Sequence, residues 1–312
     1  MITVTYKTKP EEKEIFKQLP NISFLNEIKT KEERIEILKN TEILITFFPD
    51  KELTKDELEI LSKSTKLRLV QCILSGTDHI KKEWFGKAKI QGNSGAYAKI
   101  MVEHIFAFIL FFAKNILTNH MKLKNGIYEM NTNNIFLNGK TIGILGVGGI
   151  GKEVARISKC FNMKVLGINT TGKIDDKNVD EIYTLENLEY VLKNSDIIVI
   201  CLPLNEQTEN LITYDKLNLM KKDGILINVG RGPIINQRDL YFFLKENPEF
   251  KCALDVWWQE PAFNQEFKID YPFFELPNFI GSPHISALTK ETFKIRTQYL
   301  VDKIKNIIGL LK

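Results

Sequence analysis

The strongest information about the fold is a regular alternation of short apolar runs, rich in β-branched residues, with longer amphipathic segments. This alternation is typical of parallel sheets whose strands are joined by crossover helices. Some runs, such as IIVIC at residues 197–201, are continuously apolar, as expected for a sheet covered on both faces. We therefore predict a doubly wound α/β fold. The predicted strands are residues 2–6, 42–47, 67–72, 141–146, 163–168, 196–202, 224–229 and 251–256.

The length and the position of one motif predict two sheets. A chain of 312 residues exceeds the usual size of a single domain. A glycine-rich turn at residues 146–151 starts a new α/β unit well inside the chain, whereas residues 1–93 carry strands of their own. The amphipathic segment 291–312 predicts a C-terminal helix. The most economical arrangement is one parallel sheet interrupted by another.

Composition and charge argue against several classes of protein. The net charge is only +4, and its 43 basic and 39 acidic residues are scattered, so the basic stripe of a nucleic-acid-binding protein is missing. The N-terminus is charged too early for a signal peptide, and the longest apolar run, residues 105–113, is too short to cross a bilayer. The cysteines are far apart and lie in or beside apolar runs, which suits a reducing compartment. We expect a cytoplasmic protein without nucleic-acid or membrane partners; its cysteines are Cys72, Cys160, Cys201 and Cys252.

The glycine-rich turn GVGGIG has the context that a dinucleotide-binding motif requires, because it follows a predicted strand and opens a predicted helix. Gly146 permits the tight turn, Gly148 lets a pyrophosphate approach the backbone, and Gly151 allows the helix to pack closely on the strand. The N-terminus of the helix then faces the phosphates. Together with Gly149 and Ile150, these glycines predict a nucleotide-binding loop.

The end of the next strand bears on the choice of cofactor. An Asp or Glu usually lies there and binds the adenosine ribose, but here the sequence reads Asn169-Thr170-Thr171-Gly172-Lys173. Without a carboxylate, a 2′-phosphate meets no repulsion, and two hydroxyls and a lysine can hold it. The alternative is that Asn169 bonds the ribose and Lys173 is ordinary surface charge. The sequence therefore leans towards NADP over NAD.

Four residues with catalytic chemistry lie at or just after predicted strand ends, where open α/β sheets bind their ligands: Arg231, Asp255, Glu260 and His284. An arginine there can hold a carboxylate through two charge-assisted hydrogen bonds, and a histidine paired with a carboxylate can transfer a proton. From spacing alone, each of them could also be structural. The other histidines are scattered and form no set of metal ligands, so we expect no metal; they are His79, His104 and His120.

Several longer segments recur in the order and at the spacing of one known family. They are SGAYAKIMVEHIFAFIL (94–110), GKTIGILGVGGIG (139–151), LPLNEQTENLI (202–212), MKKDGILINVGRGPIIN (220–236), ALDVWWQEP (253–261) and SPHIS (282–286). In these segments the chain resembles the D-isomer-specific 2-hydroxyacid dehydrogenases. The resemblance covers most of the chain and is strongest between residues 94 and 287.

The resemblance implies a catalytic set. In this family the arginine after the Asn-x-Gly step binds the substrate carboxylate and keto oxygen, which implies that role for Arg231. The glutamate before the proline pairs with the histidine, so Glu260 would favour the charged form of His284. His284 would then donate a proton to the keto oxygen as hydride arrives, and accept it in the reverse direction.

The resemblance also implies binding residues. A loop in the first domain, with Ser75 and Gly76 at its centre, would receive the substrate carboxylate on its backbone amides. Asp255 would contact the nicotinamide end of the cofactor. The other implied cofactor contacts, besides the glycine-rich turn and residues 169–173, are Leu202, Pro203, Thr208, Val229, Gly230, Arg231, His284 and Ala287.

The family fold implies a flavodoxin-like substrate domain of residues 1–93 plus 288–312, interrupted by a Rossmann cofactor domain of residues 94–287. Members are usually homodimers through the cofactor domains. The chain departs from the family in the arm before the first cofactor strand, which often has a tryptophan and here reads KNGIYEMNTNN. This departure bears on the dimer interface.

The resemblance implies NAD(P)H-dependent reduction of a small 2-keto acid, such as glyoxylate or hydroxypyruvate, and the reverse reaction. A short 3-phosphoglycerate dehydrogenase is an alternative, and it would need cationic groups near residues 75–82, where Lys81 and Lys82 lie. An alternative of another class is a nucleotide-sensing, corepressor-like binding protein, because one branch of the family keeps the fold and catalytic residues. Glu260 argues against the formate dehydrogenase branch, in which a glutamine pairs with the histidine.

Overall fold

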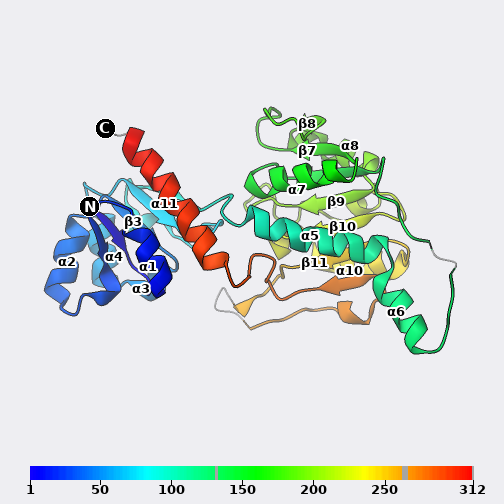
Figure 1. Cartoon of the computed structure of the whole chain (residues 1–312), viewed down its shortest axis with the longest axis horizontal. Helices are drawn as coiled ribbons and strands as arrows, with labels where there is room; N and C mark the ends of the chain where they lie inside the picture. Colours follow the sequence, from blue (N-terminus) through cyan, green and yellow to red (C-terminus); the bar gives the residue numbers. More distant parts are fainter. Residues whose placement is uncertain (131–132, 262–265, 311–312) are drawn as a thin grey trace. The chain divides into compact units, whose positions relative to one another are not determined.

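The computed structural model describes residues 1–130, 133–261 and 266–310. The chain forms two compact units (Figure 1): Met1–Tyr97 with Thr289–Lys312, and Ala98–Leu288. Each unit contains one parallel sheet with helices on both faces, so the predicted doubly wound α/β class is confirmed. The sequence placed the boundaries after residue 93 and before residue 288, and the roles of the two units remain a proposal.

The first unit has five parallel strands in the order β2-β1-β3-β4-β5, which is the flavodoxin-like order. The ladder is continuous; β1 pairs with β3 through Ile2 and Ile43, for example. The strands are β1 (Ile2–Val4), β2 (Ile22–Phe24), β3 (Ile43–Thr46), β4 (Leu69–Cys72) and β5 (Lys89–Gln91).

Two hydrophobic clusters attach the helices of the first unit to opposite faces of this sheet. Phe16 of α1 and Leu300 of α11 pack with the buried side chains of β1 on one face. Leu38 of α2 and Leu61 of α4 pack on the other. The helices are α1 (Pro10–Phe16), α2 (Lys31–Lys39), α3 (Pro49–Glu52), α4 (Lys55–Ser62) and α11 (Thr292–Leu310), with short 3₁₀ turns η1 (Leu25–Glu27) and η2 (Lys82–Phe85).

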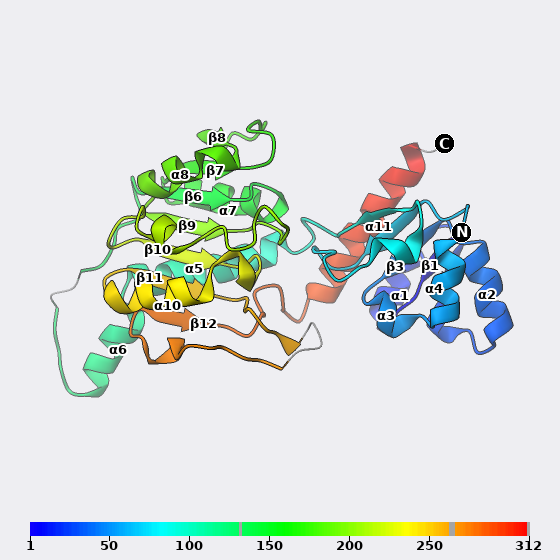
Figure 2. The same ribbon diagram turned by 180° about the vertical axis from the view of Figure 1, so that it is seen from behind.

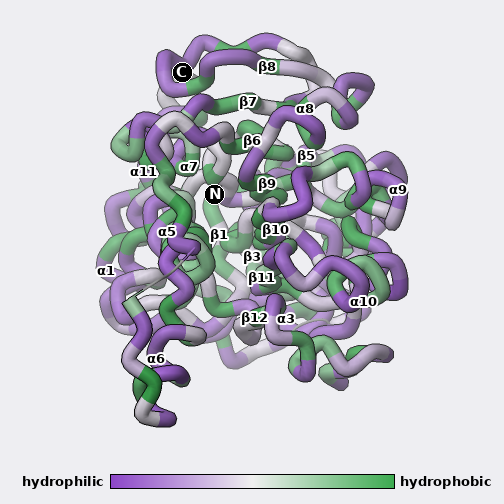
Figure 3. The backbone as a smooth tube through the Cα atoms, turned by 90° about the vertical axis from the view of Figure 1, so that its right-hand side faces the viewer, coloured by the Kyte–Doolittle hydropathy of each residue, from purple (hydrophilic) through white to green (hydrophobic). Residues whose placement is uncertain are grey.

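The second unit has seven parallel strands in the order β12-β11-β10-β9-β6-β7-β8. The chain order reverses between the neighbouring strands β6 and β9, which is the crevice where Rossmann folds bind dinucleotides. The central strands are apolar along their length (Figure 3). The strands are β6 (Thr141–Leu145), β7 (Lys164–Ile168), β8 (Glu181–Tyr183), β9 (Ile197–Ile200), β10 (Ile225–Asn228), β11 (Lys251–Leu254) and β12 (Phe279–Gly281).

Helices cover both faces of the second sheet as well. Helices α5 and α7 pack against each other and on the sheet, and α8, α9 and α10 contribute to the cluster on the opposite face (Figure 2). The helices are α5 (Ala98–Ala113), α6 (Ile116–Lys124), α7 (Gly149–Cys160), α8 (Leu188–Asn194), α9 (Tyr214–Leu217) and α10 (Gln237–Glu246), with 3₁₀ turns η3 (Leu185–Asn187), η4 (Gly232–Ile234) and η6 (Phe273–Glu275).

Within the described ranges, no single helix has the length and apolar content needed to cross a membrane; α5 and α6, bent by 54° at their junction, reach both only as a pair. The same residues contain no group of three or more His, Cys, Asp or Glu side chains that could hold a metal ion.

Candidate active site

The glycine-rich turn lies between β6 and α7, and its geometry explains the glycines. Gly146 has a φ of +103°, and a Cβ there would lie 2.9 Å from the carbonyl carbon of Cys201 on the neighbouring strand end. A Cβ on Gly151 would lie 2.3 Å from the carbonyl oxygen of Gly146. At Gly148 the space is open, as a pyrophosphate requires. The turn, completed by Gly149 and Ile150 at the start of α7, therefore fits a dinucleotide.

The loop after β7 is organised by Asn169. Its Oδ1 accepts hydrogen bonds from the backbone amides of Thr171 (3.0 Å) and Gly172 (2.7 Å). Its Nδ2 donates to the carbonyl oxygen of Lys173 (2.9 Å). Thr170, Thr171 and Lys173 are exposed. Asn169 thus holds the loop in a fixed shape and leaves a hydroxyl- and lysine-bearing edge open to solvent.

The ends of β9 and β10 come close to each other through their backbones. A Cβ on Gly230 would lie 2.6 Å from the carbonyl oxygen of Leu202, so a larger residue would separate the two strand ends. The hydroxyl of Thr208 is buried and donates to the carbonyl oxygen of Pro203 (2.7 Å), which closes the loop after β9. Val229 is buried directly after β10. These residues shape the same edge of the sheet as the glycine-rich turn.

Arg231 follows this edge and caps the short turn η4. Its Nη1 donates to the carbonyl oxygen of Gly230 (2.8 Å), and its own carbonyl oxygen accepts from Nδ2 of Asn228 (2.8 Å). The next residue, Gly232, lies against the backbone of Trp257, where a Cβ would approach the carbonyl carbon to 2.2 Å. The Arg231 backbone is therefore fixed on both sides, which limits where its guanidinium can reach.

His284 and Glu260, both after strand ends of the second unit, are joined by a hydrogen bond. Nδ1 of His284 and Oε2 of Glu260 are 2.5 Å apart. Glu260 is only 4% exposed, and its Oε1 accepts the backbone N–H of Trp257 at 2.6 Å, so the carboxylate is held in place. The His284 side chain is 35% exposed and its φ is +54°, a left-handed conformation rare for residues other than glycine. Because Nδ1 is engaged, Nε2 is the nitrogen available to a substrate.

The left-handed turn at His284 is held by Asp255. This buried carboxylate accepts the hydroxyl of Ser282 (2.5 Å) and the backbone amide of Ile285 (2.9 Å) on Oδ1, and the amide of Ser286 (2.9 Å) on Oδ2. Donors on both sides of His284 thus converge on one carboxylate. The nicotinamide contact predicted for Asp255 remains a prediction. The geometry shows in addition that Asp255 holds residues 282–286, the histidine loop, by three hydrogen bonds.

His104 and Ser282 are residues of the site to which sequence reasoning gave no role. Nε2 of His104, on α5, lies 3.0 Å from the hydroxyl oxygen of Ser282, which in turn bonds Asp255. The imidazole packs edge-on against Phe108, with the ring centroids 4.6 Å apart. His104 and Ser282 are 178 residues apart in sequence, so no spacing could have indicated their contact.

The loop predicted to bind substrate follows β4 in the first unit. The carbonyl oxygen of Leu74 accepts the amide of Asn93 (2.7 Å), and that of Ser75 lies so close to Gly92 that a Cβ there would approach it to 2.0 Å. Among the residues that the structure describes, the amides of Ser75 and Gly76 donate to no acceptor, and the buried hydroxyl of Ser75 has no partner. The loop therefore offers donors for an anion.

Comparison with family models identifies the second unit. Residues 106–286 match the model described as "D-isomer specific 2-hydroxyacid dehydrogenase, NAD binding domain". The matched range includes every residue named above at the strand ends of that unit.

Curated relatives cover most of the chain. A glyoxylate reductase of Aeropyrum pernix is 33% identical over 76% of this chain and 72% of its own length. A hydroxypyruvate reductase of Thermotoga maritima is 28% identical over 90% of this chain and 89% of its own length. A D-3-phosphoglycerate dehydrogenase of Methanocaldococcus jannaschii is 30% identical over 89% of this chain, but the chain spans only 52% of that longer protein.

A solved structure of the same architecture contains a nicotinamide cofactor. An acyclic imino acid reductase in complex with NADPH and D-Arg aligns over 99% of this chain and 98% of its own, with a TM-score of 0.74 and 25% identity. The likeness extends over both units.

Proposed function

The chain belongs to the D-isomer specific 2-hydroxyacid dehydrogenase family, an NAD(P)-dependent class of oxidoreductases, and we propose that it reduces glyoxylate or hydroxypyruvate to the D-2-hydroxy acid. The observation that carries this proposal is the pairing of His284 with buried Glu260 at the edge of a dinucleotide-binding sheet. A carboxylate beside an imidazole favours its charged, proton-donating form, which is what reduction of a keto group needs.

His284 and Glu260 act as the proton-transfer unit. The nicotinamide cofactor, when bound, supplies the hydride that adds to the keto carbon. His284 donates its Nε2 proton to the keto oxygen, so that the C=O bond becomes C–OH, and it regains a proton from solvent afterwards. Glu260 holds the ring by Nδ1 and offsets the positive charge before the transfer. In oxidation the neutral imidazole accepts the hydroxyl proton instead.

Arg231 holds the substrate carboxylate and polarises its keto oxygen. Guanidinium groups bind carboxylates through two parallel hydrogen bonds, which fixes orientation as well as affinity. The backbone of Arg231 is fixed by Asn228 and by the close approach of Gly232 to Trp257. This support favours a guanidinium with a defined direction.

We further propose that the amides of Ser75 and Gly76 receive the substrate carboxylate. In a planar trans peptide, the C=O and the next N–H point in opposite directions. Because the carbonyl oxygens of Leu74 and Ser75 point towards residues 92 and 93, the amides of Ser75 and Gly76 point away from that support. Adjacent free amides of this kind bind anions.

For the cofactor we propose NADPH over NADH. The oxygen and the nitrogen of the Asn169 side-chain amide both bond within the loop, so Asn169 is a weak partner for a ribose hydroxyl. The hydroxyl of Thr171 bonds within the loop, to the carbonyl oxygen of Lys173 at 3.2 Å. The exposed hydroxyl of Thr170 and the charge of Lys173 are therefore the groups that the loop offers to a 2′-phosphate.

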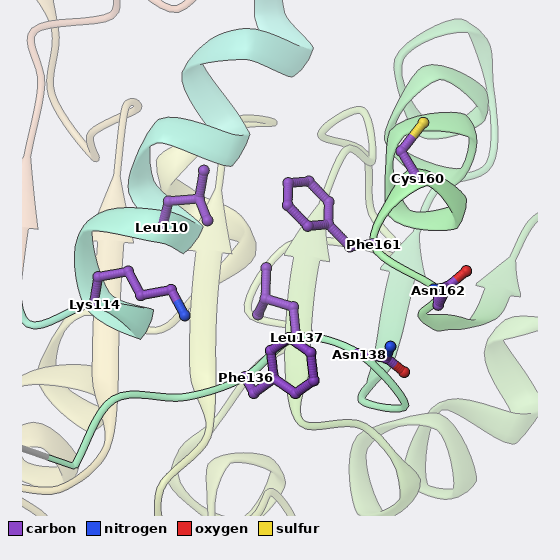
Figure 4. A pocket seen from close by; sticks show the side chains of 8 residues that line it. All are labelled: Leu110, Lys114, Phe136, Leu137, Asn138, Cys160, Phe161 and Asn162. Carbon is purple, nitrogen blue, oxygen red and sulfur yellow. The ribbon is translucent and has the colours of Figure 1, made fainter.

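We propose a homodimer formed through the second units. Helix α6 and the arm after it expose many large apolar side chains: Ile116, Leu117, Met121, Leu123, Ile127, Tyr128, Met130 and Phe136. Beside the arm, a cavity of about 330 Å³ lies between α5, the end of α7 and residues 136–138 (Figure 4). Exposed apolar surface of this extent is typical of an interface. Residues 131 and 132 of the arm lie outside the described residues.

Two alternatives remain part of the proposal. The match to a 3-phosphoglycerate dehydrogenase favours phosphorylated substrates, for which Lys81 and Lys82 would supply charge, although Lys81 lies over the ring of Trp84 at 5.6 Å. A corepressor-like nucleotide sensor would bind the cofactor without turnover.

We place the protein in the cytoplasm because its four cysteines are free thiols.

A substrate panel tests the proposal. NADPH and NADH oxidation is followed with glyoxylate, hydroxypyruvate, pyruvate and 3-phosphohydroxypyruvate, with His284→Ala as the control. We expect the first two acids to give the highest kcat/KM, and His284→Ala to lose about 10²–10⁴ of the rate. Preference for the phosphorylated acid would favour the dehydrogenase alternative. Cofactor binding without turnover would favour the sensor.

A further inference from the structure

The loop that carries Ser75 and Gly76 is anchored by a third carbonyl group. The hydroxyl of Tyr97 donates to the carbonyl oxygen of Ile73 at 2.8 Å, and both groups are buried. Three consecutive carbonyl oxygens, those of residues 73–75, therefore contact segment 92–97. Since each peptide turns its N–H away from its C=O, this contact sets the direction in which the loop presents its amides.

Tyr97 belongs to a buried polar cluster. Burial raises the pKa of its phenol to about 12, against the opposing pull of the Arg296 charge, so it stays a neutral donor. Arg296 donates from Nη2 to Oε1 of Glu12 at 3.2 Å, and the hydroxyl of Thr297 donates to the same oxygen at 3.1 Å. Tyr6 lies on the other side of Glu12, with its hydroxyl 3.4 Å from Oε1. A charged pair this deep in the unit needs these partners to offset its desolvation.

Helix α11 holds segment 92–97 at two more points. Nδ2 of Asn93 donates to the carbonyl oxygen of Arg296 (3.0 Å), and Nζ of Lys303 donates to that of Gly92 (2.8 Å). Burial lowers the pKa of Lys303, and the charge of Lys89 acts in the same direction. The segment beneath the loop is thus fixed by one face of the C-terminal helix.

We propose that Tyr97 is a positioning residue for substrate binding: held beside the Glu12–Arg296 pair, it orients the loop so that the amides of Ser75 and Gly76 meet the substrate carboxylate. This inference rests on the proposed function for its kinetic effect. The placement of the loop rests only on contacts within the first unit. Without the phenolic hydroxyl, the buried carbonyl of Ile73 loses its donor and the loop relaxes towards another one.

The test compares Tyr97→Phe with Tyr6→Phe in the full chain. Both variants remove one hydroxyl from the same buried cluster, but among the described residues the Tyr97 hydroxyl donates to the loop, whereas the Tyr6 hydroxyl donates to Glu12. We expect Tyr97→Phe to raise KM for the 2-keto acid about fivefold or more, the size of one lost hydrogen bond, with kcat and the Kd of NAD(P)H within twofold of the parent. Tyr6→Phe should leave KM within twofold. An unchanged KM in Tyr97→Phe, or an equal rise in both, would overturn the proposal.

Amide hydrogen exchange gives a readout that does not depend on turnover. Peptides covering residues 73–77 should exchange faster in Tyr97→Phe than in the parent or Tyr6→Phe, when each protein is measured at the same interval below its own Tm. Equal exchange in all three proteins would refute the positioning role even if the kinetics changed. If the parent reduces no 2-keto acid, the proposed function fails, whereas faster exchange in Tyr97→Phe would still support control of the loop by Tyr97.

Discussion

Replacing Asp255 by Asn tests whether the histidine loop is held as the structure indicates. Both oxygens of Asp255 accept backbone amides, from Ile285 and Ser286, and Oδ1 also accepts the hydroxyl of Ser282. An amide group must therefore turn its NH₂ towards a backbone N–H, whichever way it is oriented. The variant loses at least one charge-assisted hydrogen bond and gains a donor–donor contact, which should cost about 2–4 kcal/mol. If His284 is displaced and the whole of this free energy is added to the activation barrier, kcat drops about 30- to 1,000-fold.

The assay is steady-state reduction of the preferred 2-keto acid, together with the Kd of NAD(P)H. The loop-holding role predicts a fall in kcat with the Kd within twofold, whereas a nicotinamide contact predicts weaker cofactor binding. Ser282→Ala removes one of the three donors and should lose about tenfold in kcat. Ser286→Ala is the control, because the Ser286 hydroxyl has no partner in the described structure and its amide is kept. Parent-like kcat in Asp255→Asn would refute the reasoning.

Three other variants test separate parts of the account. Arg231→Ala should lower kcat/KM by about 2–4 kcal/mol of transition-state stabilisation, with an unchanged Tm; near-normal kcat/KM on every acid that the parent reduces would show that Arg231 is not the carboxylate clamp. Asn169→Asp keeps an acceptor for the Thr171 and Gly172 amides and adds charge, so NADH use should improve and NADPH use weaken; a parent that already prefers NADH tenfold would end the NADPH proposal. Burial raises the pKa of Asp196, but hydrogen bonds from Lys221 and the Thr141 amide lower it by more, so that the pKa lies below its usual value. Its contribution to stability is therefore present above its unfolded pKa and lost as pH falls through the folded one, so Asp196→Asn should cost about 1 kcal/mol at pH 7, and the difference should shrink below about pH 4 in denaturant titrations; equal stability at pH 7 would contradict the pairing.

The strands of the fold were predictable where they are buried on both faces. All eight runs predicted from the sequence form strands, and their short length and their β-branched residues favour a buried strand over a buried helix. The four strands that were not predicted are the edges of the two sheets: β2, β5, β8 and β12. Each has three residues and is partly exposed, so neither its length nor its pattern distinguishes it from a loop.

In the candidate site, too, some features were predictable from the sequence and others were not. The glycine-rich turn was predictable because backbone crowding leaves only glycine there, as the close approach of Gly151 to Gly146 illustrates. The contact of Glu260 with His284 was expected from the resemblance, and the structure brings the two together. The partners of Asp255 and the contact of His104 with Ser282 were not predictable, since they depend on how α5 and the loop after β12 meet in space.

The central claim is that His284, paired with Glu260, donates the proton in keto-acid reduction, and the pH–rate profile of the parent and of Glu260→Gln tests it most directly. Reduction needs the charged imidazole and oxidation the neutral one, so the reductive rate should fall with rising pH and the oxidative rate should rise. Removing the carboxylate charge disfavours the charged imidazole, and the reductive fall should move to lower pH in Glu260→Gln, while the melting temperature stays near that of the parent. A reductive profile that is identical in both proteins, with a solvent isotope effect showing that proton transfer limits the rate, would contradict the account.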